Sequence, residues 1–227
     1  ILGPLPAIMK LVDEGKLNLD LPFSTYWKPW RRQKDKASIT LREILAHQSG
    51  LEPYIVFLSK TLKNNGRFKK RFIRSTSNKK FTNEAYDRIY VKNRFHRKMY
   101  RIINRSEVSE EKKYKYSGLS FLIFPELITQ LTGMPYAEYM QENFYKPLGM
   151  KTFGFLPSTK NFSSKIVPTE VDTIYRHTLT HGWVHDENAS LLGGISGNAG
   201  LFGTAQDLAI IMQMYVQGGI FNGNRYI

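Results

Sequence analysis

The sequence predicts an α+β protein in which helix outweighs strand. Several stretches place apolar residues at helical spacing between start and stop signals, and an Asn-Gly pair near the end of the chain is typical of a hairpin between two strands. The 227 residues are 41% hydrophobic, which is enough to bury a core. Because no internal repeat and no long linker divides the chain, we expect one domain over residues 1–227.

Two helices are predicted in the first part of the chain. Residues 4–14 carry prolines in their first turn and are followed by Gly15, an order typical of a helix start and stop. In the stretch "ITLREILAHQSG", Thr40 and Glu43 have the spacing of a capping box, and Gly50 ends the pattern.

A longer helix is predicted after Tyr116. Its apolar residues follow an i, i+3, i+4 pattern that ends at Gly133: Leu119, Leu122, Ile123, Leu127 and Leu131. The stretch "PYAEYMQENFYKPLGM" then predicts a short helix that begins with Pro135 and stops before Pro147.

The last predicted helix is "AQDLAIIMQMYVQGG", which Thr204 and Asp207 open and two glycines close. The final stretch, "FNGNRYI", contains the Asn-Gly turn. The chain therefore ends where strands are expected to begin.

The net charge of +14 comes from one part of the chain. Residues 59–115 carry 19 Lys and Arg against 5 Asp and Glu, and the rest of the chain is balanced. Two interpretations of this basic insert stay open: a solvated excursion whose aromatic residues pack on the core, or an anion-binding surface for lipid A, teichoic acid, nucleic acid or an acidic glycan. The confinement of the charge to one insert argues against nucleic acid as the partner.

Other function classes are excluded by what the sequence lacks. It has no cysteine, which excludes thiol catalysis and Cys-based zinc sites, and it has no apolar run long enough to span a membrane. We do not expect its first residues to act as a signal peptide. His181 and His185 are four residues apart, but Gly182 and Trp183 between them disfavour a helix, so we expect no metal. We expect residues 181–203 to form a hydrogen-bonded loop with tight glycine turns beside a cleft.

Five stretches, in order, resemble the serine beta-lactamase and penicillin-binding-protein-like hydrolases, in their class C and esterase branch. They are "AIMKLVDEGKLNLDLPF", "ITLREILAHQSGL", "KYKYSGLSFLIFPELITQLTG", "YAEYMQENFYKPLGMKTFGF" and "HGWVHDENASLLGGISGNAGLFGTAQDLAIIMQMYVQGG". The stretch "VPTEVDTIYRHTLTHGWVHDENASLLGGISGNAGLF" resembles two kinds of relative equally, stand-alone esterase-like members and the serine hydrolase modules fused behind a family-three glycoside hydrolase. The resemblance implies a beta-lactamase/transpeptidase-like fold, of which this chain holds mostly the helical part and an incomplete antiparallel sheet.

The resemblance also implies site residues. Tyr116 matches the family's catalytic tyrosine, which shares proton transfers with a Ser-x-x-Lys pair, and Ser117 matches the middle residue of the Tyr-x-Asn motif. Gly118 stands where Asn or Asp is usual, so a side chain that orients the substrate or the lysine is missing. His185 and Asn198 are expected to face the same cleft as substrate-binding residues. The alternative interpretation, which needs no resemblance, is that Tyr116 and Ser117 only begin a helix and that the phenol packs on the core.

The remaining family motifs are expected outside this chain. The resemblance places Ser-x-x-Lys just before Ile1 and the Lys-Thr-Gly strand beyond Ile227, so we expect no catalysis from this stretch alone. The matches Ser77 to Lys80 and Ser109 to Lys112 lie in charge-rich stretches and are attributed to chance.

Two functions follow from these expectations. The first is a serine hydrolase of the periplasm or cell envelope that forms an acyl-enzyme on a small-molecule or peptidoglycan-derived amide, lactam or ester and needs no cofactor. The second is a non-catalytic protein on the same scaffold that binds an anionic envelope polymer through the basic insert.

Overall fold

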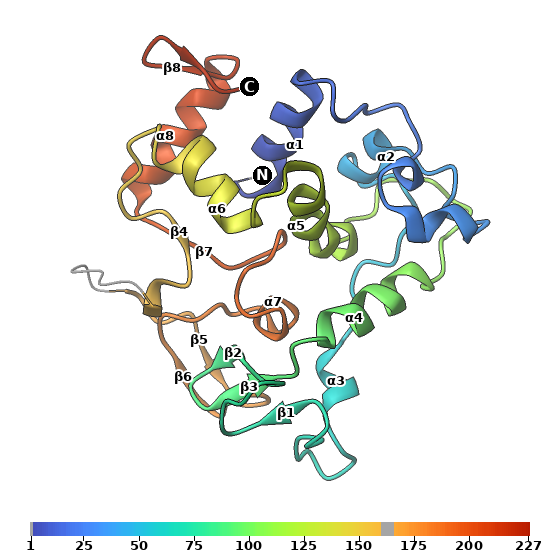
Figure 1. The fold of residues 1–227 in the computed structure, drawn as a ribbon, viewed down its shortest axis with the longest axis vertical. Helices are drawn as coiled ribbons and strands as arrows, with labels where there is room; N and C mark the ends of the chain where they lie inside the picture. The colour runs from blue at the N-terminus through green and yellow to red at the C-terminus, as the bar shows by residue number, and fades with distance from the viewer. Residues whose placement is uncertain (1, 160–165) are drawn as a thin grey trace. The chain divides into compact units, whose positions relative to one another are not determined.

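The computed structural model describes residues 2–159 and 166–227, and these residues form helices and short antiparallel strands (Figure 1). The helices are α1 (Pro4–Asp13), α2 (Leu41–Leu45), α3 (Leu58–Thr61), α4 (Phe95–Asn104), α5 (Leu119–Thr132), α6 (Tyr136–Met140), α7 (Glu187–Leu191) and α8 (Ala205–Val216). The strands are β1 (Ile73–Arg74), β2 (Asn83–Tyr86), β3 (Ile89–Val91), β4 (Gly154–Phe155), β5 (Glu170–Asp172), β6 (Thr178–Thr180), β7 (Leu201–Phe202), β8 (Ile220–Phe221) and β9 (Asn224–Arg225). The α+β prediction is confirmed.

The chain folds as two compact units, each assembled from segments that are distant in the sequence. The first unit consists of Ile1–Ile55, Ile102–Phe153 and Gly203–Ile227. The second unit consists of Val56–Arg101 and Gly154–Phe202. The assignment of residues 1–227 to a single domain with an insert at 59–115 stays a prediction.

The core of the first unit is helical. Helix α5 packs against both α1 and α6, and its side chains are apolar around most of its circumference, as expected for a buried helix. It ends at Gly133, whose φ of 72° is left-handed, so the predicted stop is confirmed. The residues that α5 buries include Leu122, Ile123, Phe124 and Leu127.

The predicted caps of the first unit are confirmed. The Thr40 hydroxyl accepts from the Glu43 backbone N–H at 3.1 Å, and the Glu43 carboxylate accepts from the Thr40 N–H at 2.7 Å, which completes the capping box of α2. Thr204 caps α8 by accepting from the Asp207 N–H at 3.3 Å. The turn between β8 and β9 contains Asn222 and Gly223 at positive φ, as the Asn-Gly pair predicts.

The helix predicted from Pro135 differs from expectation in its second half. After α6 the chain widens into a π-helical turn, η3 (Gln141–Tyr145), which brings Phe144 and Tyr145 into the core. A π turn rotates the side chains that follow it relative to a regular helix, and the sequence pattern gives no signal for this change.

Three of the four small sheets of the described residues lie in the second unit, and the fourth, β8–β9, lies in the first. Strands β1, β3 and β2 form an antiparallel sheet in that order, and β5 pairs with β6 and β4 with β7. Within the described residues, no sheet exceeds three strands. No element was predicted in the basic insert, but most of it is structured: it contains most of α3, this three-stranded sheet and α4. Residues 181–203, predicted as a loop, contain α7.

Candidate active site

The segment that ends at the start of α5 is bound to residues 47–53 of the same unit. The Lys115 N–H donates to the His47 carbonyl at 2.9 Å, and the Gly118 N–H donates to the Pro53 carbonyl at 3.1 Å. Two separate parts of the chain thus hold each other in place through backbone hydrogen bonds on both sides of Tyr116 and Ser117.

Ser117 is the buried residue of this turn, with 3% of its surface exposed. Its hydroxyl donates to the Glu52 carbonyl at 2.6 Å and accepts from the Leu119 N–H at 3.3 Å. Its own N–H donates to Nδ1 of His47 at 3.3 Å. All three of these hydrogen bonds go to other residues of the protein, so Ser117 holds the turn in place.

Tyr116 has the opposite environment. It is 58% exposed, and its hydroxyl has no hydrogen-bond partner among the described residues. Its ring lies on the His47 ring with the centroids 4.6 Å apart, and Phe121 stacks on that imidazole at 5.7 Å. Neighbouring rings therefore hold the Tyr116 ring, while more than half of the residue's surface stays exposed.

His47 is a part of this arrangement that the sequence analysis did not select. Its φ of 55° lies in the left-handed region, which is uncommon for a residue other than glycine. Burial lowers the pKa of His47, and the bond from the Ser117 N–H requires an unprotonated Nδ1. The neutral imidazole consequently carries its proton on Nε2. The stretch "LAHQSGL" was the available signal, but only the fold shows what this histidine contacts.

Gly118 leaves open space at the helix start. Its φ of −85° and ψ of −7° suit any residue, and a Cβ built on it would meet no atom within 4 Å. Neither the backbone nor the packing explains a glycine at this position.

Neither Ser-x-x-Lys match of the chain has the geometry of a catalytic pair. Ser77 and Lys80 are both exposed, and the Ser77 hydroxyl donates to the Phe81 carbonyl at 3.2 Å. Lys112 is also exposed and is paired with Glu43. A serine nucleophile needs an adjacent base to take its proton, and these lysines do not supply one.

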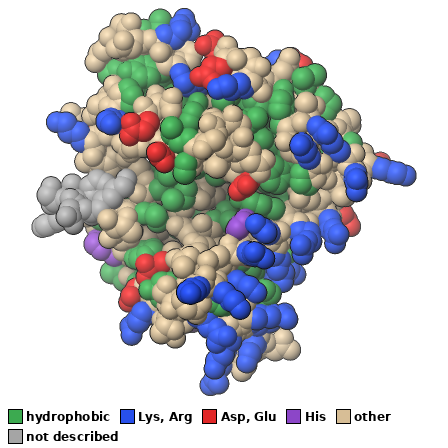
Figure 2. Space-filling model, viewed as in Figure 1, with side chains coloured by type: hydrophobic (Ala, Val, Ile, Leu, Met, Phe, Trp, Pro, Cys, Tyr) green, Lys and Arg blue, Asp and Glu red, His purple; other side chains and the backbone are tan. Residues whose placement is uncertain are grey.

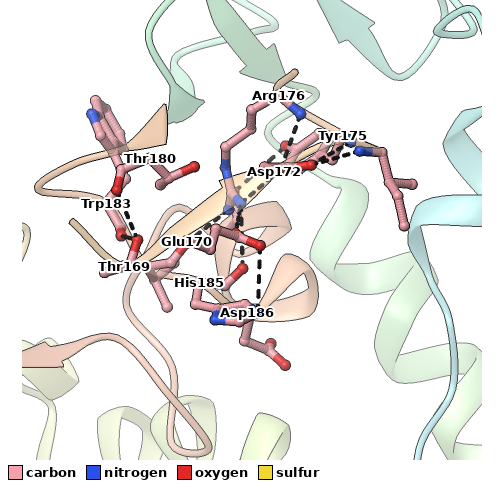
Figure 3. Close-up of polar contacts among 12 residues, drawn as sticks. Thr169, Glu170, Asp172, Tyr175, Arg176, Thr180, Trp183, His185 and Asp186 are labelled. Carbon is pink, nitrogen blue, oxygen red and sulfur yellow. Dashed lines mark hydrogen bonds and ion pairs between the residues drawn. The ribbon is translucent and has the colours of Figure 1, made fainter. Parts of the chain in front are cut away.

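His185 and Asn198 belong to the second unit. Nε2 of the exposed His185 lies 3.4 Å from the Glu170 carboxylate, and the His185 carbonyl accepts from Arg176 at 3.3 Å (Figure 3). Asn198 is half-buried, and its Oδ1 accepts from the Ser196 hydroxyl at 2.7 Å. No hydrogen bond joins these two residues within the part of the chain that the structure describes.

Arg176 is the centre of a buried charge network. Its guanidinium pairs with Glu170 at 2.7 Å and with Asp172 at 3.0 Å, and it donates to the Val184 carbonyl at 2.8 Å. Burial raises the pKa of Asp172, but hydrogen bonds from three backbone N–H groups and the charge of Arg176 outweigh it and hold that pKa below its usual value. The charges are paired internally, so this network holds the β5–β6 hairpin and the segment leading to α7.

Two glycine turns of residues 181–203 are required by close contacts. Gly194 and Gly200 have φ of 80° and 106°, and a Cβ on Gly200 would collide with the Gly194 carbonyl. Asp186 caps α7 by accepting from the Ala189 N–H at 2.7 Å. The described residues contain no group of three or more His, Cys, Asp or Glu that could hold a metal ion. In the same residues, every helix is too short or too polar to cross a bilayer.

Two solved structures define the class of this fold. The octameric penicillin-binding protein homologue from Pyrococcus abyssi aligns with a TM-score of 0.62 and 19% identity, over 96% of this chain and 43% of that one. The class C beta lactamase from Rhodobacter sphaeroides aligns with a TM-score of 0.56 and 17% identity, over 96% of this chain and 49% of that one. The chain thus has a beta-lactamase/transpeptidase-like fold.

The sequence comparisons identify the family. The Beta-lactamase family profile matches residues 7–225. The "Putative D-alanyl-D-alanine carboxypeptidase" of Salmonella gallinarum (strain 287/91 / NCTC 13346) is 30% identical over 230 residues, which are 94% of this chain and 48% of that protein. The chain belongs to the Beta-lactamase family, and it spans about half the length of the curated relatives that it matches.

Proposed function

We propose that the protein is a serine hydrolase that opens an amide, lactam or ester through an acyl-enzyme, with Tyr116 as a proton-transferring residue. The observation that carries this proposal is the accessible Tyr116 phenol on a ring held by His47, ahead of α5. Membership of the Beta-lactamase family supports the reaction class.

The division of labour follows from the chemistry of a serine nucleophile. A serine hydroxyl attacks a carbonyl only when a neighbouring base removes its proton, and a phenol on the facing wall returns a proton to the leaving group. The resemblance assigns the nucleophile to a Ser-x-x-Lys segment before Ile1. Residues 1–227 by themselves are therefore proposed to be inactive, and the test uses the full-length protein. Ser117, Gly118, His185 and Asn198 are proposed to shape the substrate site.

The proposed substrate is a peptide that ends in D-alanine, in the cell envelope. The carboxypeptidase name of the Salmonella relative supports this choice among the amides, lactams and esters. Release of free D-alanine from a peptide ending in D-Ala-D-Ala tests it directly.

The decisive variant is Tyr116→Phe in the full-length protein. It removes the phenol oxygen and keeps the ring on His47, so turnover of the peptide and of a chromogenic ester should fall by at least about a hundredfold. Because the hydroxyl has no partner among the described residues, the free energy of unfolding should change by less than about 0.5 kcal/mol. Tyr114→Phe is the matched control, since Tyr114 is a second exposed tyrosine near His47. Retention of the parent rate by Tyr116→Phe would remove Tyr116 from the mechanism.

The second candidate is a non-catalytic binding protein on the same scaffold. Gly118 in place of Asn favours it, because the substrate-orienting side chain is absent. A fluorophosphonate probe separates the two candidates: covalent labelling of the full-length protein supports the hydrolase, and its absence together with a lack of turnover supports the binding protein.

A further inference from the structure

The second unit carries a concentration of positive charge. Between Pro53 and Asn83 the chain has 9 Lys and Arg and no Asp or Glu. In Figure 2, blue side chains gather over the region that contains α3 and β1 in Figure 1. Such a density of one sign raises the local concentration of anions.

Two cations lie over the Phe72 ring, Arg71 and Lys98, and Lys69 and Lys60 are close enough to act on the charge of Lys98. We call these four residues the cationic cluster. The Arg71 guanidinium lies 4.7 Å from the centroid of the Phe72 ring, and Nζ of Lys98 lies 4.4 Å from it. Nζ of Lys69 donates to the Lys60 carbonyl at 3.4 Å. Residues from α3, from the segment before β1 and from α4 thus converge on one surface.

Among the residues that the structure describes, no acid neutralises this cluster. Its four cations form no ion pair with any described residue, whereas Arg88 in the same unit pairs with Asp87. The pKa of Lys98 is lowered, first by burial and then by the charges of Arg71, Lys69 and Lys60. The mutual repulsion of these cations would be relieved by an external anion.

The surroundings of the cluster discriminate between classes of polyanion. Proteins that bind single-stranded nucleic acid stack bases on accessible aromatic faces, but here Arg71 and Lys98 lie over the half-buried Phe72, and Arg74 lies over the buried Phe81. Membrane-surface sites add several exposed apolar residues to their cations; here Val56, just before α3, is exposed, and residues 57–101 add no further large exposed hydrophobic side chain. Charge without stacking or insertion fits a flexible polymer in solution.

We propose that the cationic cluster is a binding surface for a linear polymer whose repeating charges are phosphates and which has no stacking bases. The planar guanidinium of Arg71 pairs with two oxygens of one phosphate, and the lysine ammonium groups follow its neighbours as point charges. Binding is driven by release of counterions from the polymer and is therefore strongly salt-dependent. This binding function is independent of hydrolysis.

The test measures binding of fluorescently labelled long-chain inorganic polyphosphate to the full-length protein by anisotropy, at several salt concentrations. The variant is Lys69→Gln/Arg71→Gln/Lys98→Gln. We expect affinity at about 50 mM salt to fall by at least about tenfold, and the slope of log K against log salt to decrease by about two to three. If this variant unfolds, Lys60→Gln/Arg71→Gln replaces it, because these two cluster side chains are exposed.

The matched control removes the same charge from the first unit: Lys28→Gln/Lys34→Gln/Lys151→Gln, three exposed lysines without an ion pair to any described residue. It should retain parent affinity. Equal weakening by the cluster variant and the control would overturn the proposal, as would absence of polyphosphate binding at low salt. Tighter binding to oligo(dT) or to anionic phospholipid vesicles than to polyphosphate would assign the surface to those partners instead. Each outcome is read without reference to hydrolytic activity.

Discussion

Replacement of Ser117 by alanine tests whether the turn that carries Tyr116 is held as the structure shows. The substitution removes the bond that Ser117 donates to the Glu52 carbonyl at 2.6 Å and the one that it accepts from the Leu119 N–H at 3.3 Å. The backbone bond from Gly118 to Pro53 remains, so the turn is weakened without being released.

The magnitude follows from the two bonds. Loss of a side chain that accepts from a helix-start N–H costs about 0.5–2 kcal/mol, and a carbonyl left without its donor costs about 1–3 kcal/mol when it is buried. Glu52 is half-buried, so water reaches part of this site and we expect a total near 2 kcal/mol. For a chain of this size, that loss lowers Tm by roughly 4–8 °C.

The assay is urea unfolding followed by circular dichroism, with Ser109→Ala as the control. Ser109 is an exposed serine that precedes the same turn, and its hydroxyl accepts one bond, from the Glu111 N–H. The control should stay within about 0.5 kcal/mol of the parent protein. A Ser117→Ala variant as stable as the control would refute the reasoning, because the buried hydroxyl would then contribute nothing to the turn.

Three further outcomes are expected. The pKa of His47 is lower in the folded protein than in the unfolded chain, so on acidification the unfolded chain takes up the proton at a higher pH than the folded protein does. The free energy of unfolding should therefore fall from about pH 7 to pH 5, and His47→Gln should reduce that fall when it is measured by urea unfolding at each pH. Arg176→Met should cost about 3–5 kcal/mol by the same assay, since it leaves the buried Asp172 carboxylate without its cation; a loss below about 1 kcal/mol would contradict the network. Helix α8 exposes an apolar stripe that consists of Leu208, Met212 and Val216, so residues 1–227 should self-associate, as measured by light scattering. Replacement of these three residues by polar ones should restore a monomer.

Local signals of the sequence predicted the helix ends because those ends are decided by neighbouring residues. The capping box at Thr40, the cap at Thr204 and the stop at Gly133 all involve partners within a few positions. The Asn222-Gly223 turn is local in the same sense. Each of these predictions needed only the backbone preference of a glycine or asparagine, or a side chain that bonds a backbone N–H three residues away.

The candidate site could not be predicted in the same way, because its contacts join distant segments. The His47 ring reaches Tyr116 and the Ser117 N–H across about seventy residues of chain, and no periodicity encodes that contact. Helix α4 was also not predicted. Its buried residues Phe95 and Met99 have helical spacing, but arginines and lysines dominate the composition around them. The amphipathic helix was present in the pattern, but the charge drew the interpretation to a solvated segment.

The last prediction concerns replacement of Gly118 at the start of α5. The resemblance expects Asn at this place, and the structure shows a helix-compatible backbone with open space beside the α-carbon, so nothing in the fold requires glycine. Gly118→Ala should raise the free energy of unfolding by about 0.4–1 kcal/mol, because alanine restricts the unfolded chain. Gly118→Asn in the full-length protein should fold equally well and raise turnover of the D-Ala-D-Ala peptide, because it restores a substrate-orienting amide. Comparison with Gly118→Ala separates the amide from the stability gain. If Gly118→Asn turns over the peptide more slowly than Gly118→Ala, the open space at residue 118 is itself part of the substrate site.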